Sequence, residues 1–162
     1  MISKEAFIGS VLHEFAVINH LAAKLSEKDV SYRPSEKQRS ILETLQYISI
    51  IVGATIESVV SGDKTIFTKE AERVKDLKLE DFAPAMSAQA EKIKSLVGAM
   101  TDEQLNEEVD FWVKQSRALH CMMALKFAVA YKMQLFLFMK AAGHTELSTM
   151  NAWAGADAPT KA

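Results

Sequence analysis

The sequence contains few cysteines, prolines and glycines, the residues that cross-link a chain, bend it or make it flexible. Cys121 is the single cysteine among 162 residues, which excludes an internal disulfide framework and zinc sites built from several thiolates. There are only 6 glycines and 3 prolines, while 49% of the residues are hydrophobic. That composition excludes a disordered chain. The length is typical of one domain, and we expect a single domain over residues 1–162.

The sequence also lacks an excess of charge of one sign. Its 19 basic and 21 acidic residues leave a net charge of −2, without the basic surplus of a nucleic-acid-binding protein. Lys126, Lys132 and Gln134 interrupt the longest apolar stretch, residues 119–139. Its unbroken runs fall short of the about 20 residues that a membrane span needs. No signal peptide is recognisable at the start. We therefore expect a cytoplasmic protein that binds neither membrane nor nucleic acid.

What the sequence does contain is helical periodicity. Apolar residues recur every three or four positions, which places them on one side of a helix. We expect long helices at residues 4–27, 40–60, 82–100 and 115–142. No segment alternates as a strand does. The sequence thus predicts an all-α fold, a four-helix bundle with a longer, charged crossover at residues 63–78 between helices 2 and 3 and an extended C-terminal tail from residue 147.

The second predicted helix has two candidate starts. Ser40 and Glu43 form a capping box at one of them, Ser35 with Gln38 offers an earlier one, and Gly62 follows the end of the helix. The helix is apolar on two opposite sides, which is typical of a helix that is sandwiched between layers or placed in an oligomer interface. We expect a homodimer, because the apolar area on two helix faces is larger than the area that packing within one bundle buries.

Few polar residues are candidates for chemistry. His120, Phe127, Tyr131 and Gln134 share one stripe of the last helix and are candidates to line a pocket; the alternative is a core histidine with ordinary aromatic packing. Glu43 has the chemistry of a ligand or general base, although its capping role already explains it. Other side chains carry simpler interpretations.

His13 and His20, seven residues apart, are too few for a metal site, and we interpret them as a solvated or interface pair. Cys121 is interpreted as an inert, buried thiol, because a nucleophilic cysteine needs access and a lowered pKa.

Three segments resemble the DinB/YfiT-like superfamily. Residues 32–34, Tyr-Arg-Pro, followed by residues 39–47 resemble the start of that superfamily's second helix. Residues 130–135 and the continuation to Gly143 are similar to its last helix, and residues 151–155 resemble the segment that follows it. The resemblance spans nearly the whole chain. It implies a four-helix bundle, commonly dimeric, that binds a divalent metal through one histidine of the second helix and two of the last. Some members are thiol-dependent transferases or metal-dependent hydrolases.

This sequence departs from the resemblance at all three ligand positions, where it has Tyr47, Phe127 and Tyr131. Phenylalanine has no lone pair to donate, and a neutral phenol with a pKa near 10 is a poor ligand for zinc or nickel. We therefore expect no metal and no cofactor. The three rings are expected to fill the cavity that the metal site would occupy, with His120 and Gln134 as hydrogen-bond partners of the tyrosine hydroxyls.

Three functions remain open on this basis. The first is a DinB-like bundle without metal that binds a small molecule or serves a purely structural role. The second is an enzyme with a relocated polar site, of the transferase or hydrolase type, that uses His120, Tyr131, Tyr47 and Glu43 for acid–base chemistry. The third is a dimeric interaction protein whose main role is its interface.

Overall fold

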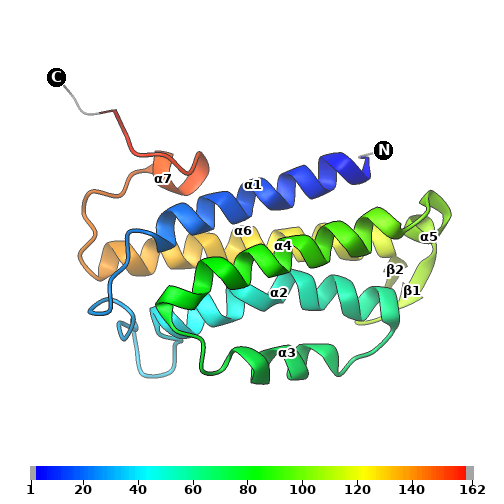
Figure 1. Ribbon diagram of the computed structural model, residues 1–162, viewed down its shortest axis with the longest axis horizontal. Coiled ribbons are helices and arrows are strands. Elements are labelled where there is room, and N and C mark those ends of the chain that lie inside the picture. Colours follow the sequence, from blue (N-terminus) through cyan, green and yellow to red (C-terminus); the bar gives the residue numbers. More distant parts are fainter. Residues whose placement is uncertain (1–2, 160–162) are drawn as a thin grey trace.

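The computed structural model describes residues 3–159, and its architecture is mainly helical, as the periodicity predicts. Four long helices lie side by side in Figure 1: α1 (Lys4–Ala22), α2 (Ile41–Ser61), α4 (Phe82–Ala99) and α6 (Arg117–Ala141). Helices α2 and α1 each contact both α4 and α6, so the four enclose a common core. Only α1 is clearly shorter than predicted, since it ends at Ala22 rather than at residue 27.

Helix α2 is the centre of the structure. Its start is the predicted capping box: the Ser40 amide donates to Glu43 Oε2 over 2.6 Å, and the Glu43 amide donates to Ser40 Oγ over 3.2 Å. Its end is Gly62, whose φ of +76° favours glycine. Fourteen of its residues are buried, among them Leu45, Ile48 and Ile56. Such a helix derives most of its stability from packing rather than from propensity.

The segment predicted as an exposed crossover contains a helix. Helix α3 (Ile66–Val74) lies along α2 (Figure 1), and a short 3-10 turn, η1 (Leu79–Asp81), leads into α4. Ile66 and Val74 are buried, Lys69, Glu72 and Arg73 are exposed, and Glu70 pairs with Lys92 of α4 over 3.0 Å. Because α3 covers the second apolar side of α2, that side is sandwiched within one chain and does not by itself require a partner subunit.

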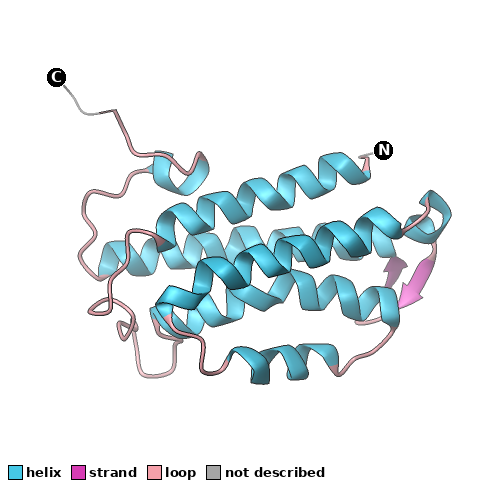
Figure 2. Cartoon of the chain, viewed as in Figure 1, coloured by secondary structure: helices cyan, strands magenta, loops and turns pink. Residues whose placement is uncertain are grey.

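Two further elements were not expected. After α5 (Asp102–Asn106), which begins at a Thr101–Gln104 capping box, β1 (Glu108–Asp110) and β2 (Lys114–Ser116) form an antiparallel hairpin (Figure 2). Val109 pairs with Gln115 in this hairpin. Strands of three residues are too short to show an alternating pattern. Phe111, in the turn, is buried against the end of the helical core.

The C-terminal segment is not simply extended. It contains α7 (Thr149–Trp153), which packs on α1. His13 Nε2 lies 3.2 Å from the carbonyl oxygen of Trp153, and His20 Nε2 lies 3.1 Å from the Asn151 amide nitrogen. The two histidines therefore contact the C-terminal segment instead of forming a solvated pair. Their contacts fix one end of this segment to the outer side of α1.

Two helices, α2 and α6, are long and apolar enough to cross a membrane by length and composition alone. For α2, 72% of the most apolar stretch is buried inside the structure, whereas for α6 the value is 39%. Helix α2 is thus a core helix. Helix α6 instead presents a partly exposed apolar face.

Candidate functional site

The two tyrosines at the predicted ligand positions meet between α2 and α6. The ring centroids of Tyr47 and Tyr131 are 4.7 Å apart, with the planes tilted by 55°. Phe67 of α3 adds an edge contact to Tyr47, with the centroids 5.5 Å apart. These distances are typical of favourable aromatic pairs. The aromatic rings therefore connect α2, α3 and α6 at one point.

Arg39 covers this pair from the loop before α2. Its guanidinium carbon lies 4.1 Å from the centroid of the Tyr47 ring and 6.0 Å from that of Tyr131. The first distance is that of a cation–π contact. Arg39 belongs to the segment that carries the family resemblance, but nothing in the sequence marks it as a site residue. Its role depends on how the loop folds back over α2.

The surroundings keep the Tyr47 phenol protonated. Burial, together with the charge of an ionised Tyr131 and its hydrogen bond, raises the pKa of Tyr47 to about 12, while Arg39 acts in the opposite direction. A phenolate ligand is thus harder to form here than in water. Phe127 offers no donor atom at all and packs instead against Trp112 of the hairpin, with the centroids 6.2 Å apart.

These donors do not fit a metal ion. Zinc and similar ions need deprotonated or neutral lone-pair donors, and catalytic zinc sites have three such protein ligands. Between residues 3 and 159, no three histidine, cysteine, aspartate or glutamate residues are grouped so that they could hold one. Burial raises the pKa of the Cys121 thiol to about 11, so this buried residue is also a poor source of thiolate at neutral pH.

His120 does not join the tyrosines, contrary to the prediction. It precedes Tyr131 by eleven residues, which corresponds to about 16 Å along a helix. Its side chain is fully buried under the hairpin, where Nδ1 lies 3.1 Å from Gln115 Nε2 and the ring faces Phe111. His120 and Tyr131 therefore lie on the same stripe of α6 but do not belong to the same site. Within residues 3–159, no hydrogen bond joins His120 or the half-buried Gln134 to either tyrosine hydroxyl, so the predicted partners are wrong.

Glu43 is explained by its structural role. Besides capping α2, its Oε2 lies 3.2 Å from an Arg33 guanidinium nitrogen. The Ser40 amide, the Arg33 charge and their hydrogen bonds together hold the pKa of Glu43 below its usual value in spite of burial. A lowered pKa makes the carboxylate a weaker base, and its bonds to Ser40 and Arg33 already engage it, so Glu43 is poorly suited to act as a general base.

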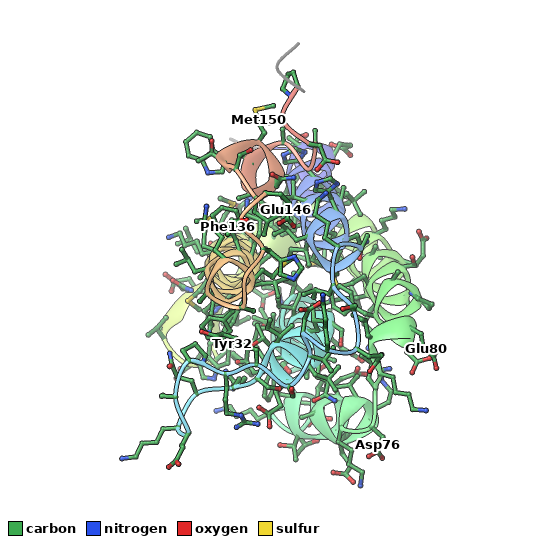
Figure 3. All side chains as sticks on the ribbon, turned by 90° about the vertical axis from the view of Figure 1, so that its left-hand side faces the viewer. Tyr32, Asp76, Glu80, Phe136, Glu146 and Met150 are labelled. Carbon is green, nitrogen blue, oxygen red and sulfur yellow. The ribbon has the colours of Figure 1, made fainter. Side chains whose placement is uncertain are left out.

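A cavity of about 450 Å³ opens beside the aromatic pair. Residues 33–39, the first turns of α2 and the end of α3 form its walls, at the end of the molecule that faces the viewer in Figure 3. Tyr47, Ile50 and Val74 contribute apolar surface, and Arg39 and Gln46 contribute polar groups. Its size lies within the range of about 300–1,000 Å³ that is usual for ligand pockets. Of the predicted pocket residues, Tyr47 and Glu43 line this cavity.

Comparison with known proteins identifies relatives of one kind. The uncharacterized protein YjoA of Bacillus subtilis is 25% identical over 151 residues, which cover 91% of this chain and 96% of YjoA. The crystal structure of YjoA, described as a DinB-like protein, matches with a TM-score of 0.70 and 26% identity over 88% of this chain and 95% of that one. No family model matches the sequence.

A second solved structure supports the fold. A DinB-like protein from Bacillus cereus matches with a TM-score of 0.55 and 17% identity, over 86% of this chain and 92% of that one. The homologous proteins are thus DinB-like in both sequence and structure, and the fold of this chain is of the same helical kind.

Proposed function

We propose that this chain is a DinB-like four-helix bundle in which aromatic residues have replaced the metal-binding histidines, and that it binds a small molecule without a metal ion. The contact between Tyr47 and Tyr131, with ring centroids 4.7 Å apart, is the observation that carries the proposal. The resemblance places histidines at these two positions. The two tilted rings in contact make a packed wall where an open coordination site would otherwise lie.

The cavity next to this wall favours binding over a purely structural role. The cavity of about 450 Å³ that has Tyr47 in its lining opens to solvent, so a ligand can reach it. Binding sites of this type combine apolar walls with a few polar groups. The relocated acid–base site has less support, because proton transfer needs groups within about 3 Å of the reacting atom. His120 is too far along α6 from Tyr131 to share such a site.

Metal analysis of the purified protein tests the proposal. We expect no stoichiometric zinc, nickel or iron after purification, and no saturable heat when zinc is titrated into the protein. The proposal would be contradicted directly if the wild type bound a metal ion stoichiometrically and the variant Tyr47→Phe/Tyr131→Phe did not. If both proteins bound zinc equally weakly, that binding would lie at another site.

An apolar stripe on α6 supports a dimer as a second feature. Leu119, Val129 and Leu137 are 56%, 38% and 57% exposed, and they lie on one side of the helix with the half-buried Met133. Lys126 is the single charge in this stripe. Contiguous exposed apolar surface of this kind is typical of interaction sites. We propose that two copies of the chain associate through this face of α6, in a cytoplasmic protein.

Light scattering of the wild type is expected to give twice the 18.0 kDa mass of one chain. The variant Leu137→Lys should give the mass of one chain, because a charge at a symmetric interface meets its own copy. Glu91→Lys, on the exposed side of α4, is the control and should remain a dimer. A wild type that stays monomeric at high concentration would contradict the dimer.

A further inference from the structure

The cavity beside Tyr47 carries an excess of positive charge. Four basic side chains and two acidic ones line it. Two of the four basic groups are already paired, because Arg33 lies 3.2 Å from Glu43 and Lys75 forms an ion pair with Glu72. The other two, Lys37 and Arg39, have no carboxylate within ion-pair distance anywhere in residues 3–159.

The contact with Tyr47 holds the Arg39 side chain in one position. Its guanidinium carbon lies over the Tyr47 ring, 4.1 Å from the centroid. A guanidinium in a cation–π contact keeps N–H edges available for hydrogen bonds. Those edges match the two oxygens of a carboxylate or phosphate. Part of the conformational entropy that Arg39 loses on binding a ligand is therefore already lost in the free protein.

The two carboxylates of the lining do not pair with this group. Glu43 Oε2 already accepts from the Ser40 amide over 2.6 Å and pairs with Arg33, and Glu36 forms no ion pair with Arg39 or Lys37 within residues 3–159. Ile50 and Val74 also line the cavity and contribute apolar surface. The cavity therefore combines unpaired cationic groups with apolar surface.

We propose that this cavity binds a small organic anion, a carboxylate or phosphate group carried on a compact apolar body. The anionic group would pair with Arg39 and Lys37, and the apolar body would lie against the side formed by Ile50 and Val74. The proposal rests on the proposed function insofar as that function assigns small-molecule binding to this end of the bundle, and it adds the chemical class of the ligand.

A titration followed by NMR tests both sides of the cavity. The probes are phenyl phosphate, which has an anionic and an apolar part, inorganic phosphate, which has only the first, and phenol, which has only the second. We expect saturable shifts with phenyl phosphate, confined to residues 33–50 and 71–75. Binding of either fragment should be weaker, because each uses one side only.

Two charge-matched variants locate the effect. Arg39→Gln is expected to weaken phenyl phosphate binding about tenfold or more, because it removes hydrogen bonds to a charged group. Lys64→Gln removes the same charge from the exposed turn at the far end of α2 and is expected to change the affinity less than about twofold, since distant exposed charges are screened. Arg39→Lys keeps the charge without the flat, forked geometry and should fall between the wild type and Arg39→Gln. Unchanged backbone spectra of the free variants would show that the fold is intact.

The outcomes separate this inference from the proposed function. Absence of saturable phenyl phosphate binding, or equal losses in Arg39→Gln and Lys64→Gln, would overturn the anion site. Phenol binding as tightly as phenyl phosphate would also overturn it, yet would leave a metal-free binding protein. Stoichiometric metal in the wild type, together with Arg39-dependent phenyl phosphate binding, would overturn the proposed function and leave the anion site standing.

Discussion

Replacing Tyr47, Phe127 and Tyr131 together with histidine is expected to give the chain a site that binds one zinc ion with at least micromolar affinity. Positions 127 and 131 lie one turn apart on the same side of α6, where neighbouring Cβ atoms are about 5–6 Å apart. Position 47 already brings its ring against that of position 131, with the centroids 4.7 Å apart. Three imidazoles in this arrangement would match a zinc site with three histidine ligands and an open position.

Calorimetric titration of zinc, with metal analysis after dialysis, measures the effect. At a free zinc concentration about 100 times the dissociation constant, binding should stabilise the folded variant by about 2.7 kcal/mol. The variant Tyr47→His/Tyr131→His, which keeps Phe127, is the matched control and should bind zinc much more weakly, since it lacks the third ligand. A triple variant that binds zinc no better than the wild type would show that these positions do not face one point, and the proposed replacement would fail with it.

Lys132→Met is expected to lower the free energy of unfolding by about 3–5 kcal/mol, because it leaves the Glu14 carboxylate without its partner in the interior. Lys132 Nζ lies 2.6 Å from Glu14 Oε2 between α6 and α1, and the side chains are only 6% and 16% exposed. For a domain of this size, each kcal/mol lowers Tm by about 2–4 °C. Urea unfolding and thermal melting of the variant both measure the loss.

Two further variants show whether the ion pair is the cause. Lys64→Met removes an exposed lysine in the turn after α2 and should change stability by no more than about 0.5 kcal/mol. Combining Lys132→Met with Glu14→Leu should recover most of the lost stability, since apolar replacement of both members of a buried pair is often nearly neutral. Equal losses in Lys132→Met and Lys64→Met would contradict the argument.

The long helices could be predicted because each has a regular apolar repeat and a recognisable boundary. Ser40, Glu43 and Gly62 define α2 by local chemistry alone, and the structure places the caps at those residues. Helix α3 was missed because its cluster of charged residues was interpreted as an exposed connection, although Ile66, Phe67 and Val74 hold it against α2. The hairpin and α7 were missed because elements of three to five residues leave no period to detect.

The candidate site was only partly predictable. The aromatic pair followed from aligning Tyr47 and Tyr131 with the ligand positions of a resembling superfamily, whereas Arg39 depends on a loop conformation that no spacing encodes. His120 was wrongly assigned to the tyrosine site because the prediction considered its angular position around the helix but not its distance from Tyr131 along the helix axis. Lys132 was noted in the sequence only as an interruption of an apolar stretch, since its partner Glu14 lies on a helix more than a hundred residues earlier.

The central place of α2 has a consequence for synthesis of the chain. Residues 41–61 leave the ribosome well before residues 117–141, on which α2 packs, have been translated. At about 5–20 residues per second, the delay lasts for several seconds. During that time α2, which is apolar on two sides, can pack only against α1, α3 and α4. The core of this protein is therefore expected to close only after residues 117–141 have been translated.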